Sequence, residues 1–238
     1  MCTLTFFPIT DDKFVLTSNR DEQPMRETIP PMEYEHNGDI LIYPKDKKAG
    51  GTWIGANKNG RVASLMNGGK VPHERKDSYR LSRGIAMTEL LQAKNIMEFL
   101  KTFDFSGIEP FTIVLIEPQN KANTEKFKAF ELIWDEEKLH VTELAWKPKI
   151  WSSTPLYTRE VHQNRTAWFN QFINETPQIS PDKIWDFHHT AGNGTKTTDF
   201  IMDRGFIRTK SITQFVKDDI IKYKYEDLDK NLLVDKVL

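Results

Sequence analysis

Residues 1–24 read MCTLTFFPITDDKFVLTSNRDEQP. Residues 3–9 and 13–18 are two short runs of apolar, β-branched and aromatic side chains, and the turn-like Thr10-Asp11-Asp12 lies between them. This pattern predicts a β-hairpin that begins at the start of the chain. Pro24 ends the second strand, because proline lacks an N–H and restricts the residue before it.

Further strands and helices follow outward from this hairpin. Strands are predicted at residues 52–56 and 61–66, joined by Asn59-Gly60, a sequence that favours a tight hairpin turn. Residues 78–103 have the apolar spacing of a helix that is broken near Asn95, and residues 158–173 form another. Ser180 caps a short helix at 181–187, with proline in its first position. The other predicted strands are 111–116, 129–134, 140–144, 197–202, 206–213 and 220–225.

The order of strands, helices, strands, helices and strands predicts an α+β fold with mostly antiparallel sheets. Residues 26–39, which contain Pro30-Pro31 and Asn37-Gly38, are interpreted as irregular. Asp203-Arg204-Gly205 is expected to form a turn between two strands. The loops are short, so we expect a single domain over residues 1–238.

The composition is that of an ordinary globular protein. The chain has 238 residues, 38% hydrophobic and 28% charged, with a net charge of -1, so it shows no basic signature of nucleic-acid binding. One cysteine excludes an internal disulfide, and the sequence has neither a secretory signal nor an integral membrane segment. We expect a cytoplasmic protein without a cofactor; the oligomeric state is left open.

Cys2 is the first residue that could carry chemistry. Removal of the initiator methionine would leave a thiol and a free α-amine on one residue. The amine has an ordinary pKa of about 7.7–8.0 and the thiol about 8.5, so one residue could supply both base and nucleophile. This mechanism requires that Met1 be removed. Taken by itself, a cysteine here is more often a small, half-buried residue at a strand start.

The polar block Asn19-Arg20-Asp21-Glu22 closes the second strand of the hairpin. The hairpin would place it beside Cys2, where an arginine would favour the thiolate and Asp21 would hold the ammonium. Strand geometry sends Arg20 and Asp21 to opposite faces unless the strand stops between them. A solvated charged turn is the alternative interpretation of the same residues.

Two asparagines could stabilise an oxyanion. Asn67 follows a predicted strand and precedes Gly68-Gly69, and Asn193 lies between two glycines. An amide near a nucleophile can donate a hydrogen bond to a developing oxyanion, although both residues could equally be turn residues with positive φ. Trp53, with other aromatic residues, could line an apolar acyl pocket, and core packing is the alternative.

Two other kinds of site are excluded. Gly194-Thr195-Lys196 is not a phosphate-binding loop, because that motif follows a strand and precedes a helix. No metal site is expected, because the adjacent His188 and His189 splay apart and the remaining histidines are scattered.

The sequence resembles the NRDE family, whose best-known members are the transport and Golgi organisation proteins. The resemblance rests on five segments in order: Met1-Cys2-Thr3, Asn19 to Glu22, the stretch from Gly50 to Gly55, residues 61–67, and the stretch from Gly194 to Thr198. It covers nearly the whole chain. It implies a four-layer αββα sandwich like that of the N-terminal-nucleophile (Ntn) hydrolases, with Cys2 as nucleophile.

A more distant likeness is to the choloylglycine hydrolase and penicillin acylase group, which carries an Arg-Asn-x-Asp block on its second strand. Matching Asn19 and Asp21 to that block puts Ser18 in the place of the arginine, and Arg20 is two residues on, on the same strand face. The likeness implies an enzyme acting through Cys2, Arg20, Asp21, Asn67 and Asn193, with Asn19 and Trp53 contacting an amide or acyl substrate. Some NRDE proteins are linked to haem or acyl-lipid handling, so a non-catalytic carrier of a haem-like or acyl ligand is the alternative.

Overall fold

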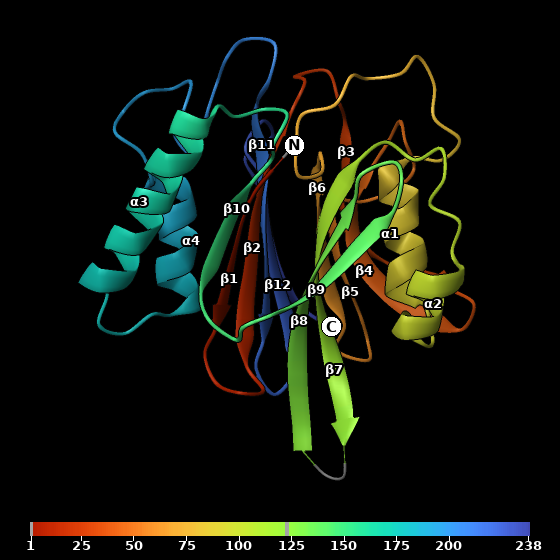
Figure 1. Ribbon diagram of the computed structural model, residues 1–238. Coiled ribbons are helices and arrows are strands. Elements are labelled where there is room, and N and C mark those ends of the chain that lie inside the picture. The colour runs from red at the N-terminus through yellow and green to blue at the C-terminus, as the bar shows by residue number, and fades with distance from the viewer. Residues whose placement is uncertain (1, 122–123) are drawn as a thin grey trace. The chain divides into compact units, whose positions relative to one another are not determined.

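The computed structural model describes residues 2–121 and 124–238 (Figure 1). Its strands form one sheet of six strands and one of seven. The contacts of the chain divide it into two compact units, which we call unit 1 and unit 2. Unit 1 combines the described residues up to Arg26 with Lys147–Val237, and unit 2 comprises Glu27–Trp146. The single-domain interpretation stays a prediction.

Unit 1 is built on the six-stranded sheet, in the order β10-β1-β2-β11-β12-β13. The strands are β1 (Cys2–Pro8), β2 (Phe14–Glu22), β10 (Lys149–Ser152), β11 (Arg208–Lys217), β12 (Ile221–Asp227) and β13 (Leu232–Val237). The N-terminal strand β1 is therefore internal, with β2 on one side and β10 on the other.

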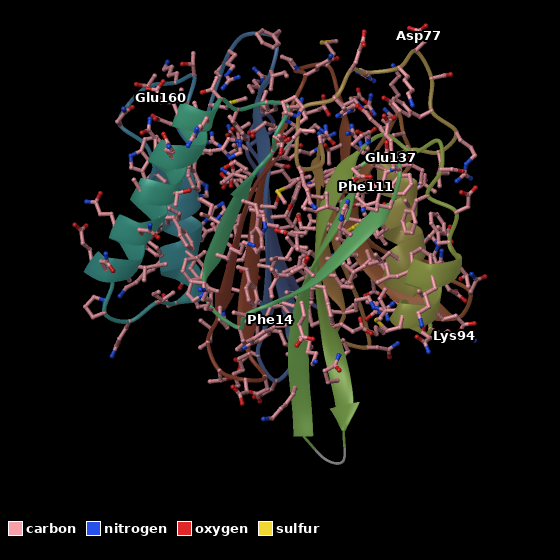
Figure 2. The ribbon with its side chains drawn as sticks, in the orientation of Figure 1. Phe14, Asp77, Lys94, Phe111, Glu137 and Glu160 are labelled. Carbon is pink, nitrogen blue, oxygen red and sulfur yellow. The ribbon has the colours of Figure 1, made fainter. Side chains whose placement is uncertain are left out.

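Two helices, α3 (Arg159–Glu175) and α4 (Pro181–Thr190), cover one face of this sheet (Figure 1). Thr158 and Ser180 cap them by accepting backbone N–H bonds, and Glu160 adds a negative charge to the first turn of α3 (Figure 2). Their apolar side chains pack against alternate residues of β1 and β2, which include Phe7 and Val15. The face of the sheet that carries Phe7 and Val15 therefore packs on the helices. We call this face of the sheet the helix face.

Unit 2 is built on the seven-stranded sheet, in the order β3 to β9. Its strands are β3 (Thr28–His36), β4 (Asp39–Asp46), β5 (Ile54–Asn57), β6 (Val62–Asn67), β7 (Phe111–Lys121), β8 (Thr124–Trp134) and β9 (Leu139–Leu144). The helices α1 (Arg83–Gln92) and α2 (Ile96–Thr102) pack on one face. A Cβ on Gly51 would lie 2.2 Å from the backbone of Gly84, so glycine is required where the chain before β5 meets α1.

A buried arginine fixes the end of α1 in unit 2. Nη1 of Arg61 donates to the carbonyls of Leu90, Leu91 and Ala93 at 3.0, 3.1 and 2.6 Å. These carbonyls lie at the helix end, where no partner inside the helix is available. Nε and Nη2 of the same guanidinium bind both carboxylate oxygens of Glu117, at 2.5 and 2.9 Å. One side chain thus links β6, β7 and α1.

Most predicted elements are confirmed. The N-terminal hairpin, the Asn59-Gly60 hairpin and the strands β7, β8, β9, β11 and β12 are present, although several are longer than predicted. The break near Asn95 is real, because Asn95 caps α2 by accepting from the N–H of Glu98. Helix α4 begins after the predicted cap Ser180, and Thr158, predicted as the first residue of α3, is its cap. The α+β class with antiparallel sheets is therefore confirmed.

Two predictions are wrong. Residues 26–39 are not irregular, because β3 occupies most of this stretch. The Pro30-Pro31 pair lies at a register shift of β3, which is an edge strand, and a missing N–H is tolerated there. Residues 197–202 are not a strand: the N–H groups of Thr198 and Asp199 turn back to the carbonyl of Thr195. The turn at Asp203-Arg204-Gly205 consequently leads into β11 from a loop. Strands β4, β10 and β13 were not predicted.

Candidate functional site

Cys2 begins β1 and is directly opposite Arg20 on β2. Residues directly opposite each other in an antiparallel pair project their side chains to the same face. The hairpin turn and the alternation of apolar residues fix this register, because a slip of one residue would turn the buried face outward. The sequence therefore brings the two residues together as predicted for the hairpin.

Arg20 is almost completely buried, with 3% of its surface exposed. Its Nη2 lies 3.9 Å from a carboxylate oxygen of Glu22, and Ser211 is opposite it on β11. Arg20 is thus a buried positive charge on the residue that pairs with Cys2, and a positive charge near a thiol favours its ionised form. Its effect on Cys2 stays a prediction.

Arg20 and Asp21 project to opposite faces of the sheet. The strand does not stop between them, because β2 continues to Glu22. Asp21 pairs with Thr209 while Arg20 pairs with Ser211, so β11 has an extra residue at this point, a β-bulge at Lys210. Asp21 is consequently on the helix face, and Arg20 is on the other.

Asn19 is also on the helix face, where it joins β2 to α4. Its side-chain amide donates to the carbonyls of His188 and Phe200 at 3.1 and 3.0 Å. Its oxygen lies 2.6 Å from Nδ1 of His188, and Nε2 of that ring lies 2.7 Å from the hydroxyl of Thr5. Because an amide oxygen can only accept, His188 carries its proton on Nδ1 and accepts from Thr5.

The environment of His188 keeps the ring neutral. His188 is completely buried, and burial, with smaller effects of His189 and Arg165, lowers its pKa to about 3. Asn19 and His188 thus form a neutral, hydrogen-bonded pair between sheet and helix. Both donor groups of the Asn19 amide are used within unit 1, so its predicted contact with substrate stays a prediction.

Asp21 is completely buried in a polar pocket of the helix face. Its oxygens accept hydrogen bonds from Thr209, at 2.7 Å, and from the hydroxyl of Tyr157. Burial raises the pKa of Asp21, whereas the positive charge of Arg165 and the bonds from Tyr157 and Thr209 oppose that rise. Each carboxylate oxygen keeps a second lone pair that could accept another donor.

Asn193 lies in the loop after α4, also in unit 1. Its side-chain oxygen accepts from the N–H of Thr195 at 3.1 Å, and its own N–H donates to Asp199 at 3.1 Å. The flanking Gly192 and Gly194 have φ of +155° and +88°. Asn193 therefore helps to organise a tight loop, and its role toward an oxyanion stays a prediction.

Asn67 and Trp53 belong to unit 2. Asn67 is the last residue of β6, half-buried and opposite Phe111. Trp53 is 5% exposed, and its carbonyl accepts from the backbone N–H of Leu65 at 2.7 Å. Asn67 ends β6 where a residue just after the strand was predicted, and Trp53 directly precedes β5 rather than lying in it. The functional roles of both stay predictions.

Sequence reasoning did not single out Tyr157 and Arg165. A signal for Arg165 existed, because it falls between Val161 and Phe169 at four-residue spacing, on the stripe of α3 that is buried. Of the described residues, no group of three His, Cys, Asp or Glu side chains has the arrangement of a metal site. No helix among them is long and apolar enough to span a membrane.

Comparison with known proteins identifies the family. The model of the family described as Transport and Golgi organisation 2 matches residues 1–214. The chain belongs to this family. A curated relative, the uncharacterised protein YGR127W of Saccharomyces cerevisiae, is 35% identical over 82 residues, covering 32% of this chain. The matched segment is about a quarter, 25%, of that relative's length.

Solved structures share the fold of this chain at low sequence identity. A variant of conjugated bile acid hydrolase from Clostridium perfringens has a TM-score of 0.60 at 9% identity, covering 99% of this chain and 92% of that one. Penicillin V acylase from Agrobacterium tumefaciens has 0.59 at 10%, covering 100% and 86%. A Caenorhabditis elegans N-acylethanolamine-hydrolysing acid amidase has 0.61 at 13%, covering 91% and 93%. The fold is therefore that of the Ntn hydrolases.

Proposed function

We propose that this protein is an N-terminal-cysteine amidohydrolase or acyltransferase that acts on a linear amide or acyl substrate through an acyl-enzyme. The observation that carries the proposal is the position of Cys2 at the start of an internal strand, opposite the buried Arg20. A nucleophile at such a position is held by pairing with β2, and the rest of its strand pairs with β10 as well. A buried cation in the same row favours its ionised form.

The reaction needs the α-amine of Cys2 to be free. The amine then accepts the thiol proton, and the sulfur attacks the carbonyl carbon of the substrate. The tetrahedral intermediate collapses to a thioester, and the leaving amine departs with the proton. Water, or a second amine in a transferase, attacks the thioester and regenerates the thiol.

Other residues have supporting roles in this proposal. Arg20 favours the thiolate, and Asp21 accepts a hydrogen bond from the α-ammonium. Asn67 and Asn193, with a backbone N–H, donate to the oxyanion; loss of one such donor typically costs about 10²–10³ in rate. Trp53 contacts the acyl group.

The fold relatives support the reaction class. Their names denote a hydrolase of conjugated bile acids, a penicillin acylase and an amidase of N-acylethanolamines. The three names are thus those of a hydrolase, an acylase and an amidase. The substrate panel for this protein therefore starts from N-acyl amides, acyl thioesters and penicillin-type amides.

The test is to incubate this panel with the wild-type protein and with the Cys2→Ala and Cys2→Ser variants. Intact-mass spectrometry first shows whether Met1 has been removed. We expect turnover and an acyl adduct on Cys2 in the wild-type protein, and neither in Cys2→Ala. A protein that makes no adduct and no product, yet binds haem or acyl-CoA equally well after Cys2→Ala, would be a carrier instead.

A further inference from the structure

Arg165 on α3 is a completely buried cation. Its Nε and Nη2 donate to the carbonyl of Thr198 at 3.1 and 3.0 Å, and Nη2 donates to the carbonyl of Asp199 at 2.6 Å. Its Nη1 donates to the hydroxyl of Thr3, and the guanidinium lies 3.9 Å from the centre of the Tyr157 ring. Each of these contacts is with a carbonyl, a hydroxyl or a ring. A buried charge is costly unless an opposite charge compensates it.

The compensating charge is Asp21, because the positive charge of Arg165 opposes the rise in the pKa of Asp21. The guanidinium of Arg165 lies over the ring of Tyr157 and donates to the hydroxyl of Thr3, and Tyr157 donates to Asp21. A carboxylate can only accept, so the bond between Tyr157 and Asp21 runs from the phenol to the carboxylate. We call Arg165, Thr3, Tyr157 and Asp21 together the Arg165–Asp21 chain.

The Arg165–Asp21 chain ends beside the nitrogen of Cys2. The strands β1 and β2 are antiparallel, and Cys2 is opposite Arg20. The nitrogen of Cys2 points toward the start of β1, and the antiparallel β2 runs from Arg20 to Asp21 in that same direction. The nitrogen therefore lies on the Asp21 side of the Cys2–Arg20 pair. Thr3, which accepts a hydrogen bond from Arg165, is the next residue after Cys2. Asp21 and Thr3, the neighbours of the Cys2–Arg20 pair on β2 and β1, therefore both belong to the Arg165–Asp21 chain.

We propose that Tyr157 and Arg165 are positioning residues, which fix the Asp21 carboxylate so that it accepts a hydrogen bond from the α-ammonium of Cys2. This inference rests on the proposed function, because it requires a free α-amine. It also gives α3 a role at the N-terminus of the chain. The positive charge of Arg165 on α3 favours the ionised form of Asp21, which accepts hydrogen bonds. An ammonium beside a carboxylate has a raised pKa, because the opposite charge favours the protonated form.

The other charged groups around Tyr157 act less directly. The guanidinium of Arg204 lies 5.5 Å from the centre of the Tyr157 ring. His162 packs edge-on against that ring, and burial together with the charge of Arg165 lowers its pKa. His162 is therefore neutral near pH 7, and the positive groups that face Tyr157 are the two arginines. Neither Arg204 nor His162 is a member of the Arg165–Asp21 chain.

The test measures the titration of the α-amine in protein whose Met1 is shown by intact mass to be absent. The amine is acylated at a series of pH values, and the modified N-terminal peptide is quantified. Tyr157→Phe removes one link of the chain while keeping the ring under Arg165, and Thr3→Val breaks the chain at a second point. The matched control is Tyr223→Phe, which alters a buried tyrosine of unit 1 outside the chain.

We expect the amine of the wild-type protein to titrate above the ordinary range of about 7.7–8.0. Tyr157→Phe and Thr3→Val should each lower this pKa by about half a unit or more, whereas Tyr223→Phe should not change it. Far-ultraviolet circular dichroism identifies variants that do not fold, and Thr3→Val then replaces Tyr157→Phe as the decisive variant.

Asp21→Asn separates this inference from the proposed function. If Asp21→Asn lowers the amine pKa but Tyr157→Phe and Thr3→Val do not, the Arg165–Asp21 chain is only structural and the inference is wrong. The proposed function would survive that result. If Asp21→Asn has no effect either, the inference again fails, together with the role given to Asp21. If Met1 is retained on the wild-type protein, the proposed function fails first.

Discussion

Asn19→Ala should destabilise the protein severely, because Asn19 joins the sheet of unit 1 to α4. The substitution removes three buried hydrogen bonds, two to the carbonyls of His188 and Phe200 and one from the His188 ring. A buried hydrogen bond contributes about 1 kcal/mol net, so the loss is about 3 kcal/mol before any penalty for the groups left without partners. In a protein of this size, that corresponds to a fall in Tm of roughly 6–12 °C.

Urea denaturation followed by circular dichroism measures this loss. Asn170→Ala is the matched control, because it makes the same chemical change at an exposed position of α3 and should change the free energy of unfolding by less than about 0.5 kcal/mol. A double-mutant cycle with His188→Ala should show a coupling energy on the order of 1 kcal/mol or more, since the two side chains contact each other.

The reasoning would be refuted by an Asn19→Ala protein that unfolds at the same urea concentration as Asn170→Ala. That result would mean that the pairing of β2 with its neighbouring strands holds this region without the side-chain bonds. Additive effects of Asn19→Ala and His188→Ala would refute a narrower point, namely that the Asn19 amide and the His188 ring act as a pair.

Three further predictions concern other parts of the molecule. The pKa of His188 is about 3 in the folded protein and about 6.5 when unfolded, so the native state binds fewer protons between these values. The free energy of unfolding should therefore fall as the pH drops from 6.5 toward 3. His188→Gln should flatten that pH dependence in urea titrations. Arg20→Ala should slow alkylation of Cys2 by iodoacetamide near neutral pH, and equal rates at every pH would show that Arg20 does not tune the thiol. Arg61→Ala should cost roughly 3–5 kcal/mol in unfolding free energy, because it removes a buried cation and leaves the half-buried Glu117 carboxylate and the carbonyls at the end of α1 without it, whereas the exposed Arg75→Ala should cost little.

The parts of the fold that follow local rules could be predicted from the sequence. The hairpin at Asn59-Gly60, the caps at Thr158 and Ser180 and the break at Asn95 each depend on a few neighbouring residues. The strand β3 could not be predicted in this way. Its two prolines oppose a strand in general, and only its position at the sheet edge, a property of the whole topology, makes them acceptable.

The candidate site shows the same division. The pairing of Cys2 with Arg20 follows from the hairpin alone, and so could be predicted. The partners of Asp21 could not, because Tyr157 and Thr209 are more than a hundred residues away in the chain. Arg165 carried a local signal, a charge on a buried helical stripe, yet its partners Thr3 and Thr198 depend on the tertiary structure.

The discontinuity of unit 1 has a consequence for biosynthesis. β1 and β2 leave the ribosome before unit 2, but their neighbours β10 and β11 belong to Lys147–Val237, which follows unit 2 in the chain. The start of the chain must therefore wait, unpaired on both outer edges, while the whole of Glu27–Trp146 is made. Pairing over such a long separation is intrinsically slow. The sheet of unit 1 is therefore completed only after the strands that follow unit 2 have been made.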